Sequence, residues 1–323
     1  MLLNFDDMSK KISDGKAYFL AGDEEVLKKL PKGNWVGGTI PYFMDTIGGI
    51  TDRSLIQAIP APADVEEFKI VFYDEKNLYK IPSEAYDNGF SFIIIPAMSN
   101  VHLEYAKNAP NYENIFFKTI IGWISGIHLS DLGKITPKVF NGLTGEATDA
   151  KAIVMHCKIK EGKIPEIGII NIFEQSDGDT IKFNQTSFSV SECEINGKKE
   201  NFADYVIKNK VDIKVPLVAN YSGSMINVSF QSVDEKNKVV NFYAPVFDGV
   251  EYKLGKPVKD YTKAFKNALD KKKLSPVFSC NCILNFLYGE LEGKHTGDVI
   301  GPITFGEIAY QLLNQTLVYL EIK

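Results

Sequence analysis

The stretch NWVGGTIPYFMDTIGGITDR, residues 34–53, most limits how this chain can fold. It contains two glycine pairs, at residues 37–38 and 48–49, separated by Pro41. Glycines beside strand-forming residues mark places where the backbone bends or where another group comes close to it. Two interpretations follow: tight packing of strands around a turn, or a cradle for a ligand that includes Gly37, Gly38 and Thr39.

The composition indicates a globular protein and argues against nucleic acid as a partner. Hydrophobic residues make up 45% of the 323 residues, and the formal net charge is −5. Binding to phosphates requires a concentrated basic face, which this balance does not favour. The short run Lys271-Lys272-Lys273 is explained by its expected place at the end of a helix, where the helix dipole favours cations.

The sequence predicts a cytoplasmic protein with no membrane partner. Asp6 and Asp7 interrupt the first residues, which lack the apolar core of a signal peptide. The most apolar run, residues 90–98, is well short of the roughly 20 residues that a spanning helix needs. In the cytoplasm the cysteines are expected to be reduced thiols.

Hydrophobic periodicity predicts many strands and several helices without strict alternation. Helices are expected at 4–13, 83–88, 99–107 with Ser99 as N-cap, 201–208 and 261–269. Strands are expected at 34–40 and 55–59, paired with each other, and at 90–95, 181–190 and 299–310, among others. This pattern predicts an α+β fold with largely antiparallel sheets packed with helices.

Two stretches of the chain resemble each other. They are AIVMHC (152–157), IGIINIFEQ (167–175) and FNQT (183–186), and then SPVFSC (275–280), IGPITFGEI (300–308) and LNQT (313–316). One interpretation is a duplicated sheet unit with a pseudo-twofold axis between the copies. The other is the chance recurrence of short sequence patterns that are common in strands.

The chain also resembles a known family, the FIST domain, from about residue 16 to its end. FSCNC (278–282), GPITFGEI (301–308) and LLNQTLVYL (312–320) are similar to the C-terminal half of that domain. NWVGGTIPYF (34–43), IIGWISG (120–126), KVFNG (138–142) and AIVMHC are similar to its N-terminal half. One departure concerns the arginine that the family tends to place shortly after FSC, because Asn281 and Cys282 follow here instead.

This resemblance implies a role and a division of the chain. The halves would be residues 1–198 and 199–323. The role would be that of an intracellular sensory domain for small molecules such as amino acids, without catalysis. Such domains are often coupled to signalling proteins, and a partner encoded separately is expected here. Some relatives are associated with haem.

Six residues are candidates for the ligand site: Gly37, Gly38, Thr39, Arg53, Glu307 and Asn314. Glu307 lies in a largely apolar strand, where a carboxylate must find a partner or shift its pKa. A ligand ammonium is one such partner, and Arg53, the only arginine in the chain, would then bind a ligand carboxylate. The alternative is that Glu307 ends its strand facing water and that Arg53 is exposed without a role.

Two other functions remain open. Cys280 would serve a cysteine-dependent enzyme if a histidine lay within hydrogen-bond reach of it. His128, on a glycine-lined strand face, would be the ligand in a haem-binding sensor. The C-x-C pair of Cys280 and Cys282 lacks the second pair that a zinc site needs. The residues alone identify no cofactor.

Overall fold

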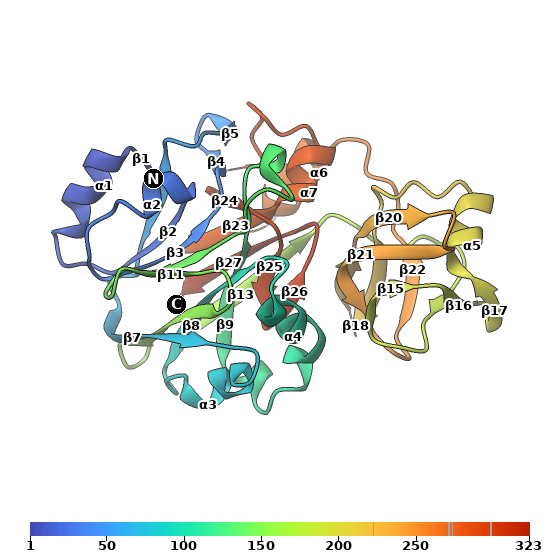
Figure 1. Cartoon of the computed structure of the whole chain (residues 1–323), viewed down its shortest axis with the longest axis horizontal. Coiled ribbons are helices and arrows are strands. Elements are labelled where there is room, and N and C mark those ends of the chain that lie inside the picture. The colour runs from blue at the N-terminus through green and yellow to red at the C-terminus, as the bar shows by residue number, and fades with distance from the viewer. Residues whose placement is uncertain (222, 271, 273, 298) are drawn as a thin grey trace.

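Figure 1 shows a computed structural model of the chain, in which a larger body is joined to a smaller lobe. The structure describes residues 1–221, 223–270, 272, 274–297 and 299–323. A bridge between Gln175 and Gly255 marks where the chain leaves the body for the lobe and returns from it. Strands make up 42% of the chain and helices 19%, and the sheets are mostly antiparallel. The predicted α+β fold is confirmed.

Three six-stranded sheets form the body. Across the first sheet lie β1 (Leu2–Leu3), β6 (Ile56–Pro60), β2 (Tyr18–Gly22), β3 (Trp35–Thr39), β10 (Val139–Asn141) and β11 (Glu146–Thr148). Across the second lie β7 (Val65–Tyr73), β12 (Ala152–Ile159), β8 (Gly89–Pro96), β9 (Thr119–Ser125), β25 (Glu307–Ala309) and β26 (Gln311–Leu313). Across the third lie β13 (Pro165–Asn171), β27 (Thr316–Ile322), β23 (Phe278–Cys282), β24 (Gly301–Thr304), β4 (Tyr42–Asp45) and β5 (Gly48–Thr51).

The three sheets share one plan. A parallel pair lies at the centre of each: β2 with β3, β8 with β9, and β23 with β24. Each pair is connected through a helix, which is α2 (Glu24–Leu27), α4 (Asn100–Asn108) or α7 (Ile283–Tyr288). The strands that flank each pair are antiparallel to it. The body therefore consists of three structural repeats.

Each sheet is completed by a hairpin from another repeat. The hairpin β4–β5 of the first repeat joins the third sheet, where Met44 lies opposite Gly301. The hairpin β10–β11 of the second repeat joins the first sheet, and β25–β26 of the third joins the second. Because this exchange is cyclic, no sheet is complete without a strand pair from elsewhere in the chain.

This threefold plan differs from the duplication that the sequence echo indicated. Residues 152–157 lie in β12, which flanks a central pair and is antiparallel to both of its neighbours. Residues 275–280 lead into β23, which belongs to a central pair and is parallel to β24. The two similar stretches of sequence therefore occupy different positions within the repeats. The two halves that the FIST resemblance implies do not correspond to the repeats either.

All three sheets face one hydrophobic core. Phe19 of β2, Phe92 of β8 and Val318 of β27 belong to it and are buried. Side chains alternate along β8, so Ile93 and Ile95 point to the opposite face and pack beneath α4. Strand β8 is therefore apolar on both faces, which is typical of a buried strand in a parallel pair.

The helices begin where the sequence places capping residues. Asn4 caps α1 (Phe5–Ile12) by accepting from the backbone N–H of Asp7, and Ser99 caps α4 by accepting from that of His102. The predicted helices near 4–13 and 99–107 are thus confirmed. The other helices are α3 (Ile81–Glu84), α5 (Phe202–Lys208) and α6 (Tyr261–Asp270), with 3₁₀ turns η1 (Leu78–Lys80), η2 (Ala109–Asn111), η3 (Ile115–Phe117) and η4 (Leu129–Asp131).

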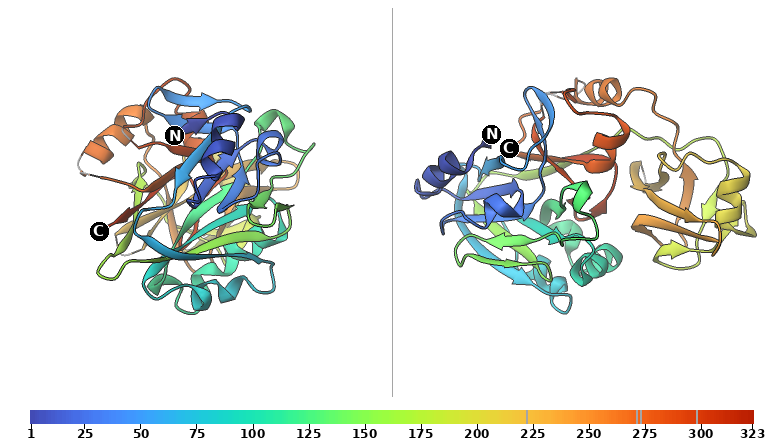
Figure 2. Two further views of the ribbon diagram at one scale, coloured as in Figure 1. Left: turned by 90° about the vertical axis from the view of Figure 1, so that its left-hand side faces the viewer. Right: turned by 45° about the horizontal axis from the view of Figure 1, so that its top comes forward.

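The lobe is an insertion in the third repeat, between β13 and α6 (Figures 1 and 2). One sheet contains β17 (Lys198–Asn201), β16 (Glu192–Ile195), β14 (Ile181–Lys182), β22 (Glu251–Leu254), β18 (Leu217–Tyr221) and β19 (Ser224–Val228). The other contains β15 (Ser187–Val190), β21 (Val239–Val246) and β20 (Phe230–Asp234). The lobe has its own apolar core, which includes Phe183, Phe202 and Phe242. A boundary between residues 198 and 199 would cut β17 within this lobe.

Several predicted elements were wrong in pairing or extent. Strand β6 pairs with β2 and not with β3, because β2 lies between them. The helix expected at 83–88 is α3, which starts earlier, with Pro82 in its first turn. The single strands expected at 181–190 and 299–310 are each two strands in different sheets: β14 and β15, and β24 and β25.

In the part of the chain that the structure describes, no helix has the length and apolar character needed to cross a bilayer. Helix α6 ends at Asp270, just before the basic run at 271–273. Lys271 and Lys273 lie outside the described residues, so the prediction for that run is untested.

Gly38 tests the exchange of strands between sheets, because it lies where the first and second sheets meet. A Cβ atom there would lie 2.6 Å from Ile94 Cγ2 and 3.0 Å from Trp123 Nε1. We expect Gly38→Ala to lower the free energy of unfolding by about 1–3 kcal/mol through overpacking. Gly178→Ala, at an exposed position, should change it by less than about 0.5 kcal/mol. Equal urea midpoints for the two variants would contradict this packing role.

Candidate functional site

Polar side chains gather in the interior where the central strands of the third sheet end. Cys282 and Thr304 lie opposite each other as the last residues of the parallel strands β23 and β24. In open sheets the carboxyl ends of parallel strands are a common place for ligands. We call the following set the polar cluster, and all of its members are buried: Asn281, Cys282, Asn285, Thr304, Glu307 and Thr316.

Glu307 is the only acidic residue of this cluster and is completely buried. Its Oε2 accepts a 2.8 Å hydrogen bond from the Thr316 hydroxyl, and the Thr304 hydroxyl lies 3.4 Å from Oε1. Burial raises the pKa of the Glu307 carboxyl to about 8, although the bonds from Thr316 oppose this rise. At neutral pH the carboxyl is therefore mostly protonated, because removal from water disfavours its charged form.

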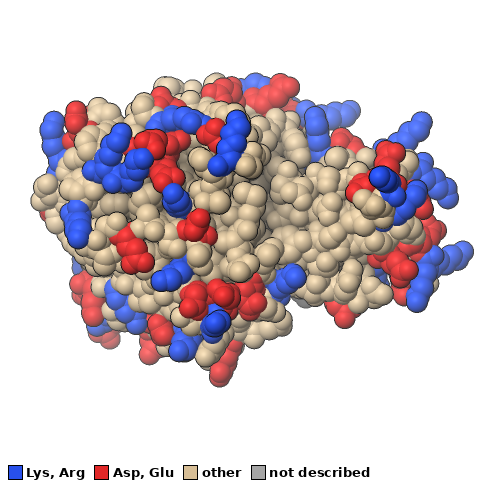
Figure 3. Space-filling view, in the orientation of Figure 1, with Lys and Arg blue, Asp and Glu red and all other residues tan. Residues whose placement is uncertain are grey.

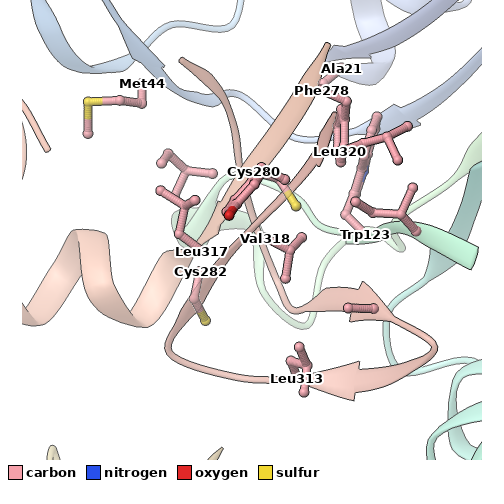
Figure 4. Packing of buried hydrophobic residues seen from close by; sticks show 14 of the residues in the cluster. Ala21, Met44, Trp123, Phe278, Cys280, Cys282, Leu313, Leu317, Val318 and Leu320 are labelled. Carbon is pink, nitrogen blue, oxygen red and sulfur yellow. The ribbon is translucent and has the colours of Figure 1, made fainter. Parts of the chain in front are cut away.

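Both cysteines of this strand also belong to the hydrophobic core, with Leu317 and Val318 close by (Figure 4). The Cys280 thiol points toward the carbonyl oxygen of Gly122, 3.6 Å away. Burial raises the pKa of both thiols, Cys280 and Cys282, well above the ordinary value. Within the described residues, no histidine forms a hydrogen bond with Cys280. The enzyme hypothesis therefore lacks the base that it needs.

Three amide atoms in and beside the polar cluster have no hydrogen-bond partner among the described residues. They are Asn281 Nδ2, Asn285 Oδ1 and Asn314 Oδ1. A buried polar atom without a partner costs about 1–3 kcal/mol, so such atoms usually bind water or a ligand. The described residues therefore do not satisfy every hydrogen-bond donor and acceptor in and beside the polar cluster.

The six predicted site residues do not form one site. Gly37 and Gly38 lie in β3, where a neighbouring sheet or strand fills the space beside them, and this agrees with the packing interpretation. The Thr39 hydroxyl accepts from the backbone N–H of Lys138. Glu307 and Asn314 lie near each other, because Glu307 pairs with Leu313, the residue before Asn314. Glu307 is completely buried, so the alternative that it ends its strand facing water was wrong.

Arg53 lies on the surface, half exposed. Its guanidinium forms ion pairs with Asp131 and, at 3.8 Å, with Asp23. The Arg53 guanidinium is thus paired with carboxylates of the protein itself. His128 is nearby and stacks on the Tyr42 ring with 5.6 Å between ring centroids, while its Nδ1 lies 2.7 Å from the Ser130 hydroxyl. This arrangement leaves the haem hypothesis untested.

A cleft that sequence reasoning missed lies between the body and the lobe. It has two adjoining parts, of about 690 and 590 Å³, which share Ile169, Ser224 and Ile226. The body and the lobe each contribute half of the residues around the larger part. These are Pro110, Asn111, Phe116, Ile169, Ala309, Tyr310 and Gln311 from the body, and Thr186, Tyr221, Ser224, Ile226, Phe247, Asp248 and Val250 from the lobe.

The surface over the junction of body and lobe carries few charged side chains in the view of Figure 3. The residues of this interlobe cleft are spread over the sequence from 110 to 311, so no local motif marks it.

Amide side chains fasten the lobe to the body beside the cleft. Asn227 of the lobe and Asn171 of the body exchange hydrogen bonds of 2.8 and 3.0 Å. Gln315, which precedes the polar cluster residue Thr316 in the turn before β27, accepts from Ser229 and donates to the Lys214 carbonyl. The turn 314–316 therefore connects the polar cluster to the lobe.

The raised pKa of Glu307 predicts a pH-dependent stability. A carboxyl with a folded pKa near 8 and an ordinary value of 4.5 gives stability that is complete below pH 4.5 and is lost as the pH rises through 8. Relative to Glu307→Gln, the wild type should lose up to about 1.4 kcal/mol of unfolding free energy per pH unit between 5 and 8. Urea unfolding at each pH measures this.

The exposed Glu161 provides the control, since Glu161→Gln should follow the wild-type pH profile. Parallel profiles for the wild type and Glu307→Gln would show that the carboxyl is ionised in the folded protein.

Comparison with known proteins gives a family and no activity. No curated protein and no solved structure matches this chain. A family model described as a family of unknown function, DUF6976, matches residues 3–323. Nothing in that match links the chain to the FIST domain. The match spans nearly the whole sequence, and the chain therefore belongs to the DUF6976 family.

Proposed function

We propose that this protein binds a small molecule in the interlobe cleft and acts as a sensor of the FIST type rather than as an enzyme. The observation that carries the proposal is the larger part of the cleft, about 690 Å³, to which body and lobe contribute equally. Ligand sites usually have volumes of roughly 300–1,000 Å³ and occur preferentially at domain interfaces.

The position of the lobe supports a sensory role. The lobe is inserted in one repeat only and is held to the body by amide hydrogen bonds such as those between Asn171 and Asn227. A ligand that contacts both units stabilises the arrangement in which both contacts are made. A separate signalling protein that binds one arrangement in preference would then respond to the ligand.

The residues around the cleft favour binding over catalysis. Among the described residues that line its larger part, aromatic, aliphatic and amide side chains predominate, and Asp248 is the only acidic or basic residue. The thiols of β23 are buried in the core and have raised pKa values. The geometry thus offers contacts for holding a ligand and no activated nucleophile.

The test fills the cleft without disturbing either core. Ser224 is exposed and lines both parts of the cleft, so Ser224→Trp should fill the space while the fold is kept. Ser232→Trp, at an exposed position of β20 outside the cleft, makes the same change elsewhere. A thermal-shift screen of amino acids, amines and small organic acids, followed by calorimetry, should give a ligand for the wild type.

We expect Ser224→Trp to weaken that ligand at least about tenfold and Ser232→Trp to leave its affinity unchanged, with the same melting temperature for all three unliganded proteins. A ligand that Ser224→Trp binds normally would place the site elsewhere. A screen without any ligand would count against a small-molecule sensor.

A further inference from the structure

We propose that the interlobe cleft recognises an organic amine with an aromatic or bulky apolar group, and not an amino acid. This inference rests on the proposed binding function and adds the chemical class of the ligand. Three features of the larger part of the cleft carry it: its aromatic walls, the backbone of one of its tyrosines, and its charge.

Aromatic side chains come from both sides of the cleft. Phe116 and Tyr310 belong to the body, and Tyr221 and Phe247 belong to the lobe. The rings of Phe116 and Tyr310 lie 5.8 Å apart, and Phe116 is 58% exposed while Tyr221 is 42% exposed. Exposed aromatic faces on two sides of a space attract a cation through their π electrons and bury its apolar part.

Tyr310 has an unusual backbone conformation. It is the turn residue between β25 and β26 and has φ +65°, which bulky residues rarely adopt. Its N–H donates to the Ile120 carbonyl at 3.0 Å, and its carbonyl accepts from the Tyr105 hydroxyl at 2.8 Å. Glycine or asparagine would be the expected residue for this turn. A tyrosine held there by two hydrogen bonds is consistent with a role for its side chain in the cleft.

The charged groups around the larger part of the cleft favour a cationic ligand. Asp248 is the only acidic residue around its larger part, and no Lys, Arg or His is among the described residues that line it. Asp248 is exposed, and its backbone N–H donates to the Thr186 hydroxyl. Among the ion pairs of the described chain, none includes Asp248. Its carboxylate is thus free to bind an ammonium group, which also finds acceptors in the Asn111 and Gln311 amides.

The same charge works against amino acids. Their ammonium group would fit, but their carboxylate would lie in the larger part of the cleft, whose described lining residues include the Asp248 carboxylate and no basic side chain to pair with it. A group left unpaired in this way reduces affinity. The expected scheme, with Glu307 for the ammonium and Arg53 for the carboxylate, is not assembled here because these residues lie outside the cleft.

Three probes of similar size separate the alternatives: 2-phenylethylamine, its neutral analogue 2-phenylethanol, and L-phenylalanine, which adds a carboxylate. Calorimetry or saturation-transfer NMR at pH 7 should show 2-phenylethylamine binding about tenfold more tightly than either of the others, the gain expected from an ion pair with cation–π contact. Asp248→Asn should remove this preference for the amine over the alcohol.

Glu235→Gln is the control because it removes one exposed carboxylate from the same lobe, in the turn between β20 and β21. It should leave all three affinities unchanged. Equal binding of amine and alcohol, or tighter binding of L-phenylalanine, would overturn the ligand class while the binding function stands. If Asp248→Asn keeps the preference, Asp248 is not the recognition group and the proposal is wrong.

The experiments distinguish an incorrect ligand class from an incorrect assignment of ligand binding to the cleft. If none of the three probes binds while a screened ligand is lost from Ser224→Trp, the cleft binds small molecules of another class. If no screened compound binds, both proposals fail.

Discussion

The exchange of hairpins between sheets is the constraint on which the rest of the structure depends. Each parallel pair needs an antiparallel neighbour on both sides, and one of these neighbours always comes from another repeat, as β4 does for β24. Strand pairing satisfies backbone groups that would otherwise be buried without a partner, so each repeat depends on another for the pairing along one side of its central strands. Close approach of backbone also occurs inside a parallel pair, between β8 and β9. A Cβ at Gly122 would lie 1.7 Å from the Ile93 carbonyl oxygen.

Comparison of the repeats shows where the third one differs. The second strand of each central pair ends on a buried hydroxyl residue: Thr39, Ser125 or Thr304. The Thr39 hydroxyl bonds to backbone, and the Ser125 hydroxyl has no partner among the described residues. Only Thr304 lies beside a buried carboxyl, and only the third repeat carries the lobe. The buried Glu307 carboxyl and the inserted lobe therefore occur in the same repeat. This favours the third repeat as the location of the functional site.

Local features of this fold could be predicted from sequence, and its long-range features could not. Capping and periodicity located α1 and α4, and continuous apolar character located β8, because these depend on neighbouring residues. Pairing depends on residues far apart, such as Gly301 with Met44, and no local pattern contains that information. The candidate residues had mixed outcomes for the same reason. Glu307 was recognised as a carboxylate in apolar surroundings, whereas Arg53 has its partner in Asp131, 78 positions away. The interlobe cleft was missed entirely, since its residues come from strands and turns that are far apart in the sequence.

The proposed function depends on the junction of body and lobe being a ligand site. A crystal structure of the protein with 2-phenylethylamine tests this claim most directly. It should show the ring of the amine between Tyr310 and Tyr221, with its nitrogen within about 3 Å of an Asp248 carboxylate oxygen. Clear density for the amine only at another place on the protein, with the cleft filled by ordered water at saturating concentration, would contradict it.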